Sequence, residues 1–222
     1  MEMPAQLPPA PDLARELRTR FSRLSFRLAL PYSLMTIGVM LLLYVAAQYG
    51  IMLREQHRLA REWQEQQQSS AATSTAMPVA RALTRLSIPK INLDAVVVDG
   101  TSRKQLLIGP GHVSSTAWPG EPGNAVITAH RDTFFRHIYE LDRGDVIELR
   151  RGGNTYKYAV TGKRVVDPDD VSVLKPTRDP ELTLITCYPT YYIGPAPERL
   201  VVHSRLVNDG ARASDVRGDG NP

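Results

Sequence analysis

The chain has a single cysteine among its 222 residues, and this scarcity excludes several classes of protein. One thiol cannot supply an internal disulfide framework, a cysteine-rich zinc site or an iron–sulfur cluster. A dense basic stripe is also lacking, although the chain carries a formal charge of +4. Residues 79–207 contain 17 Lys and Arg against 14 Asp and Glu, so the region that we expect to fold is only weakly basic. This distribution argues against a nucleic-acid-binding protein.

Charge is absent from one long segment near the N-terminus. Residues 28–53 form an uncharged run of 26 residues, and about 20 apolar residues suffice to cross the hydrocarbon core of a bilayer. A buried core helix is seldom so long and free of charge, and a cleaved signal peptide has a shorter apolar run closer to Met1. We therefore predict a single transmembrane helix over residues 28–53.

The arginines on either side of this segment predict its orientation. Five arginines precede it closely and three follow it, and those that follow are interleaved with glutamates. Because cytoplasmic flanks carry the excess of Lys and Arg, residues 1–27 are expected in the cytoplasm and the rest of the chain outside it.

The composition of residues 54–222 divides them into three parts. Residues 54–78 predict a polar helical stalk followed by a Ser/Thr/Ala linker. The folded domain is expected over residues 79–207, and the Gly/Asp-rich residues 208–222 are expected to form a disordered tail.

Short segments rich in Val, Ile, Thr and Tyr, separated by Gly, Pro, Asp and Asn, predict eight strands in this domain. They are residues 83–88, 93–98, 124–130, 145–150, 155–160, 163–167, 182–187 and 199–207. Helix is expected only as short turns around 133–140 and 169–174. Eight short strands with little helix indicate a mainly β fold, either a closed barrel or a sandwich.

The lone thiol lies at the end of a predicted strand. Cys187 closes the run TLITC, and Pro189 follows, which cannot donate a hydrogen bond within a central sheet. A thiol at a strand end can reach a cleft, whereas a lone cysteine is also commonly a small buried hydrophobic residue. A thiol nucleophile needs a base, usually histidine, and a donor for the oxyanion.

Candidates for both partners also lie at strand ends. His130 closes the predicted strand NAVITAH and opens into a polar loop, and Arg199 begins the last strand after the loop GPAPE. The other histidines are expected elsewhere, in the stalk, a Gly/Pro turn, a helical turn and the middle of a strand. They are His57, His112, His137 and His203. Taken alone, each of these side chains is more commonly structural or solvent-facing than catalytic.

Taken together, these residues resemble the sortases, membrane-anchored cysteine transpeptidases of bacterial surfaces. TLITC matches their TLxTC signature, with a histidine 57 residues upstream and an arginine 12 residues downstream. The flanking runs WPGEPGNAVITAHRDTFF, VVDPDDVSVL and TLITCYPTYYIGPAPERLVVHSR are similar to the class D branch. The resemblance extends from about Leu86 to Leu206.

The resemblance implies an eight-stranded sortase-type β-barrel in which Cys187 is the nucleophile and His130 the general acid and base. It gives Arg199 the role of stabilising the oxyanion or of holding the substrate backbone. The substrates it implies are proteins with a C-terminal LPxTG-like sorting signal, cut after Thr through a thioester. The acyl group then passes to an amine acceptor, either a cell-wall precursor or a pilin lysine.

Four further side chains are candidates for substrate binding. Tyr188, Tyr191 and Tyr192 are candidates for lining the substrate groove, with packing as the alternative, and a structural or groove-lining role is expected for His112. No cofactor or metal is expected, since the acidic run suits a turn and a helix cap better than a metal site. Its members are Asp167, Asp169 and Asp170.

Two alternatives stay open at this point. One is a non-enzymatic membrane-anchored β domain that binds a partner and keeps Cys187 buried. The other is a cysteine hydrolase or a peptidoglycan cross-linking enzyme of another fold. The absence from the sequence of an S-H-G-C-like loop, a G-x-S-x-G elbow and an H-E-x-x-H helix makes this alternative weaker.

Overall fold

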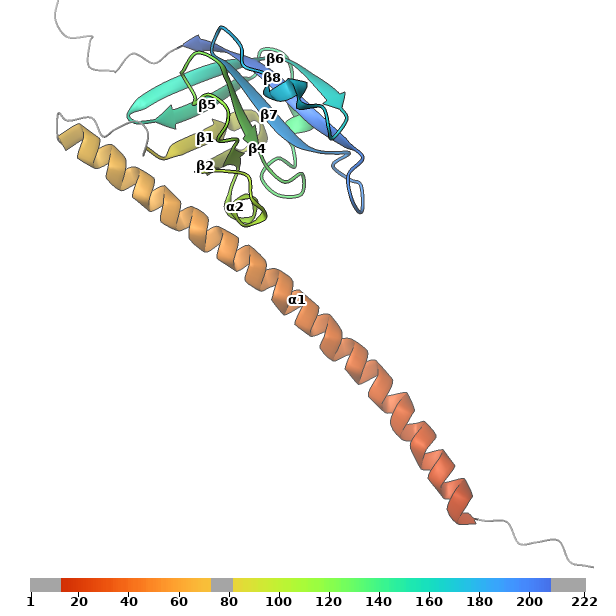
Figure 1. Cartoon of the computed structure of the whole chain (residues 1–222). Coiled ribbons are helices and arrows are strands. Elements are labelled where there is room, and N and C mark those ends of the chain that lie inside the picture. The colour runs from red at the N-terminus through yellow and green to blue at the C-terminus, as the bar shows by residue number, and fades with distance from the viewer. Residues whose placement is uncertain (1–12, 73–81, 209–222) are drawn as a thin grey trace, which may run out of the picture. The chain divides into compact units, whose positions relative to one another are not determined.

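The computed structural model describes residues 13–72 and 82–208, which form one long helix and a β-barrel (Figure 1). Contacts between residues divide the chain into two units, Met1–Gly50 and Ile51–Pro222. The expected domain start at Val79 and the expected tail beyond residue 208 lie outside the described residues.

Helix α1 spans Leu13–Ala72 without a break. Its part from Leu30 to Gln68 contains a stretch that is long and apolar enough to cross a membrane, and none of that stretch is buried against protein. The helix continues four residues into the expected Ser/Thr/Ala linker, because Ser and Ala are compatible with a helix once it has begun. Pro31 lies within this helix.

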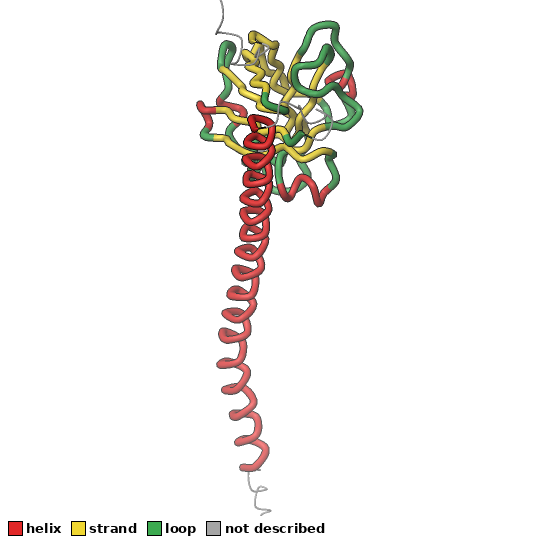
Figure 2. The backbone as a smooth tube through the Cα atoms, turned by 90° about the vertical axis from the view of Figure 1, so that its left-hand side faces the viewer, coloured by secondary structure: helices red, strands yellow, loops and turns green. Residues whose placement is uncertain are grey.

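Eight strands close into a barrel in the order β1-β2-β3-β4-β7-β8-β6-β5. Figure 2 shows the strands of this domain in yellow, joined by loops in green. The bounds of the first four are β1 Thr84–Ile88, β2 Leu93–Asp99, β3 Gly111–His112 and β4 Asn124–Thr128. The others are β5 Val146–Arg151, β6 Asn154–Val166, β7 Glu181–Tyr188 and β8 Glu198–Asn208. Pairing of β5 with β1 closes the ring, so the expected closed eight-stranded barrel is confirmed.

The set of eight strands differs from the predicted set at two places. The segments 155–160 and 163–167 are one strand, β6, whose register with β8 shifts between Val160 and Gly162. Such an irregularity bends a strand without ending it, so the prediction of two separate strands here was wrong. Conversely, β3 was missed because two residues are too short to show an alternating pattern.

Short helical turns decorate the barrel. The expected turns are present as η3 (Ile138–Glu140) and η4 (Val171–Leu174), and η2 covers Pro89–Ile91. The side chain of Asp170 accepts a hydrogen bond from Ser172 N, which confirms the predicted cap. Hydrogen bonding to the side chain and then to the backbone of Ser172 lowers the pKa of that carboxyl. Helix α2 (Arg103–Ile108) was not predicted, although a capping box between Ser102 and Gln105 marks its N-terminus.

The barrel interior is filled by alternate residues of the strands, as expected for strands with one buried face. Fully buried members include Leu86, Ile127, Leu149, Leu184 and Val202. This packing determines which side chains of β4, β7 and β8 face outward, and the outward side chains include the candidate site.

Candidate active site

Strand β7 places the thiol on the outer face of the barrel. Leu182 and Leu184 belong to the core, and Thr186 is buried in step with them. Because side chains alternate along a strand, Cys187 points to the opposite, outer face. Cys187 is only partly buried and forms no disulfide.

Strand β4 brings His130 beside the thiol. It runs parallel to β7, with Thr128 opposite Ile185. Past the end of β4 the two chains stay joined, because Ala129 N donates to Ile185 O at 3.2 Å and Thr186 Oγ1 donates to Ala129 O at 2.8 Å. His130 and Cys187 each lie two residues beyond the Thr128–Ile185 pair, so the register puts them side by side on the outer face.

Strand β8 brings Arg199 to the other side of Cys187, since the two residues are direct partners in the antiparallel β7–β8 pair. Direct partners share a face, with Cβ atoms about 4.5–5.5 Å apart. The guanidinium donates from Nη1 to Ala196 O at 3.3 Å and to Glu198 O at 2.9 Å. Arg199 is therefore held against the loop that precedes it.

The connection between β6 and β7 covers the other end of this outer face. Asn124 Nδ2 donates to Val173 O at 2.9 Å, and Thr183 Oγ1 donates to Asn124 Oδ1 at 2.8 Å. Val201, which lies on the same face opposite Ile185, is fully buried. At the other end, Cys187, His130 and Arg199 are each only partly buried.

His203 occupies the covered end. Its Nδ1 lies 3.4 Å from Thr183 Oγ1, its strand partner. Burial, followed by the charge of Arg164, lowers the pKa of His203. Thr183 is four residues from Cys187, about 13 Å along a strand, so His203 is too far away to serve as the base for this thiol.

The remaining predicted binding residues divide between core and loop. Tyr188 packs against the core, whereas Tyr191 and Tyr192 are exposed in the loop after Pro189. His112 is fully buried, bonded through Nε2 to Ala117 O at 2.9 Å and stacked on a tryptophan ring. The structure does not bring His112 to the outer face that carries the thiol.

Sequence reasoning passed over Arg131, whose guanidinium bonds to two carbonyls of the β7–β8 loop. The signal available was a cation directly after a histidine at a strand end. Among the residues that the structure describes, no three His, Cys, Asp or Glu side chains are grouped so as to hold a metal ion.

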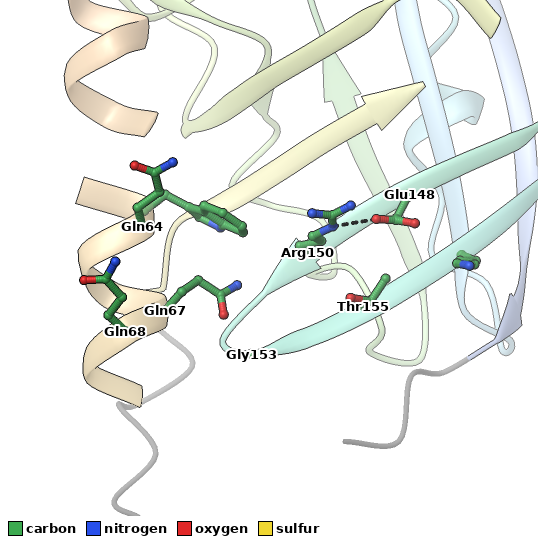
Figure 3. Close-up of a pocket in the computed structure, with 9 residues that line it drawn as sticks. Gln64, Gln67, Gln68, Glu148, Arg150, Gly153 and Thr155 are labelled. Carbon is green, nitrogen blue, oxygen red and sulfur yellow. Dashed lines mark hydrogen bonds and ion pairs between the residues drawn. The ribbon is translucent and has the colours of Figure 1, made fainter. Parts of the chain in front are cut away.

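A polar pocket lies elsewhere, lined by α1 residues such as Trp63 and Gln64 and by the β5–β6 hairpin (Figure 3). Besides Trp63, its lining consists of glutamine, charged and small residues, and it contains neither a thiol nor an imidazole. The thiol, the imidazole of His130 and the guanidinium of Arg199 belong to the outer face of β4, β7 and β8 and not to this pocket.

The chain is similar in sequence to a family of known proteins. The sortase domain family model matches residues 86–207. Sortase D of Bacillus subtilis is 38% identical over 123 residues, which cover 55% of this chain and 62% of that protein. Sortase A of Bacillus anthracis is 36% identical over 107 residues, or 46% of this chain and 50% of that protein. The chain thus spans between half and two thirds of the length of these curated relatives.

Solved structures share the fold. A sortase D5 transpeptidase of Clostridium perfringens superposes with a TM-score of 0.56 at 23% identity, covering 70% of this chain and 97% of that one. Sortase A of Corynebacterium diphtheriae superposes with a TM-score of 0.54 at 31% identity, covering 60% and 63% respectively.

Proposed function

Because the chain belongs to the sortase family, we propose that it is a membrane-anchored cysteine transpeptidase. It cuts an LPxTG-like sorting signal after Thr and transfers the substrate to an amine at the outer surface of the cell membrane. The observation that carries the proposal is the register of β4, β7 and β8, which gathers an imidazole, a thiol and a guanidinium on three neighbouring strand ends.

In the first half-reaction the ionised sulfur of Cys187 attacks the carbonyl carbon of the substrate Thr. The peptide C–N bond breaks as His130 donates a proton to the leaving amine, and a thioester is formed. In the second half-reaction the acceptor amine attacks the thioester and gives a proton to His130. The thiolate leaves, and one imidazole serves both directions.

Arg199 is proposed to stabilise the oxyanion. A guanidinium has five N–H donors and keeps its charge at any working pH. Because Nη1 alone accounts for its bonds to Ala196 and Glu198, other donors are available for a substrate oxygen while the loop stays held. A positive charge there also stabilises the tetrahedral intermediate electrostatically.

Membrane attachment is proposed through the apolar part of α1, which is exposed along its length. Of the two open alternatives, the non-enzymatic domain requires a packed thiol, whereas Cys187 is partly exposed. The other requires a different fold from the barrel seen here.

The decisive experiment is capture of the thioester. The full chain in detergent is incubated with LPxTG- and LPxTA-type peptides, quenched in acid and analysed by mass spectrometry. We expect an acyl adduct on Cys187 that disappears when a small amine is added, with the amide product appearing in its place. If a small alkylating reagent modifies Cys187 but no peptide acylates it, the proposal is wrong.

Alanine variants assign the roles. Cys187→Ala should abolish turnover, and His130→Ala and Arg199→Ala should each lower it by about two orders of magnitude or more. His203→Ala and His112→Ala serve as matched controls on other imidazoles, and their catalytic rates, corrected for folded protein, should change little. A loss with His203→Ala that exceeds the loss with His130→Ala would show that His130 is not the base.

A further inference from the structure

We propose that Arg131 is a positioning residue of this site. Its guanidinium fixes the β7–β8 loop and so places the apolar tip of that loop, Tyr191–Ile193, beside the peptide that acylates Cys187. The inference rests on the proposed function for its substrate, while the brace itself is a feature of the fold.

The contacts of Arg131 span the loop. Nη1 donates to Pro189 O at 3.0 Å, and Nη2 donates to Gly194 O at 2.7 Å. The guanidinium carbon also lies 5.9 Å from the ring centroid of Tyr192, within the range of a cation–π interaction. One side chain therefore joins the start of the loop, its middle and an aromatic residue between them.

The contacts of Arg131 complement those of Arg199 in β8. Arg131 directly follows His130, and Arg199 directly opposes Cys187. Arg199 bonds to carbonyls at the end of the loop, those of Ala196 and Glu198. The loop is thus bonded to Arg131, which follows the proposed base, and to Arg199, the proposed oxyanion donor.

The loop needs such support because it buries little of itself. Tyr191 is 84% exposed and Ile193 is 97% exposed. Exposed segments with few packed contacts lose conformational entropy when they order on a ligand, which weakens binding. A loop that is ordered beforehand by Arg131 avoids that loss.

The position of the tip indicates what it contacts. The loop starts two residues after Cys187, whose sulfur bonds to the scissile carbonyl in the proposed reaction. Side chains on this loop therefore lie close to the peptide residues that flank the scissile bond. Two tyrosines and an isoleucine offer apolar contacts, so the tip should discriminate by the size and apolarity of the residue after Thr.

The test compares Arg131→Ala and Arg131→Lys with wild type, and uses Arg136→Ala as the matched control. Arg136 lies in the same connection, is exposed, and its side chain makes no hydrogen bond or ion pair within the described part of the chain. We expect Arg131→Ala to raise KM for the peptide about tenfold, with a smaller change in kcat. Lysine should restore part of the loss, because one ammonium can donate to both carbonyls but lacks the planar fork.

Substrate selectivity provides a second readout, which would not change if Arg131 only stabilised the fold. In wild type the kcat/KM values for peptides with Gly, Ala or Leu after Thr should differ, and in Arg131→Ala these ratios should move toward one another by at least about threefold. Unchanged KM and unchanged ratios in Arg131→Ala would overturn the positioning role.

Hydrogen exchange in the absence of peptide tests the brace independently of activity. Amides of residues 190–196 should exchange faster in Arg131→Ala than in wild type or Arg136→Ala, with the barrel strands unaffected. Unchanged exchange would overturn the brace itself. Failure of wild type to form any acyl-enzyme would instead refute the proposed function, and the exchange result would still decide whether Arg131 orders the loop.

Discussion

At the scale of single residues, two imidazoles on one face of the barrel have different surroundings. His130 follows the end of β4 beside the partly exposed thiol, whereas His203 lies at the covered end against Thr183. Burial lowers the pKa of His203, and the nearby charge of Arg164 lowers it further. His203 is therefore neutral in the folded protein over a wider pH range than a free histidine.

This difference predicts an effect of pH on stability. Since the folded-state pKa of His203 lies below its unfolded value of about 6.5, the unfolded chain binds more protons as the pH falls through that value. The contribution to stability is present above about pH 6.5 and is lost on acidification. In His203→Gln the free energy of unfolding should therefore fall less between about pH 7.5 and 5 than in wild type.

Denaturant titrations followed by tryptophan fluorescence at fixed pH values provide the measurement. The control is His57→Gln, at an exposed position, and its free energy of unfolding should change with pH as in wild type. Parallel curves for wild type and His203→Gln would contradict the prediction.

At the scale of secondary-structure elements, the site depends on how firmly the end of β4 is joined to β7. The buried hydroxyl of Thr186 donates to Ala129 O, one residue before His130. A second hydroxyl, that of Thr128, donates to Ile185 O at 3.0 Å, and the same oxygen also receives Ala129 N. Each hydroxyl is the only side-chain donor to its acceptor in the described part of the chain, but Ile185 O also has a backbone donor, Ala129 N.

We expect Thr186→Val to lower the free energy of unfolding by about 1–3 kcal/mol, because it leaves the Ala129 carbonyl without that donor in a buried place. It should also lower turnover, since the backbone that carries His130 loses an anchor. Thr128→Val, the matched control, leaves Ile185 O bonded to Ala129 N and should cost less than about 1 kcal/mol. Thermal and chemical denaturation of both variants measure the difference, and equal losses would argue against the anchor.

At the scale of the whole molecule, the apolar part of α1 and the arginine bias around it predict a topology. An alkaline phosphatase fusion after Leu206 should be active, because export is required for that enzyme to fold with its disulfides. A fusion after Arg27 should be inactive. The reverse pattern would place the barrel in the cytoplasm, where the proposed surface reaction could not take place.

Much of this organisation follows from the sequence alone, because it depends on short-range patterns. A long uncharged run is a local property, and so is the alternation that puts Cys187 on the opposite face from Thr186 and separates Arg199 from Leu200. The TLITC run and the spacing of the histidine and arginine around it were likewise enough to indicate the family to which the chain belongs.

Only the tertiary structure decided which strands are neighbours. The parallel pairing of β4 with β7 joins residues 57 apart in the chain, and it selects His130 over His112 and His203 as the imidazole beside the thiol. Tertiary packing also buries His112, joins two predicted strands into β6 and brings Arg131 to the β7–β8 loop. The physical reason is that alternation specifies the face of each strand, while register and neighbour depend on packing among segments distant in the sequence.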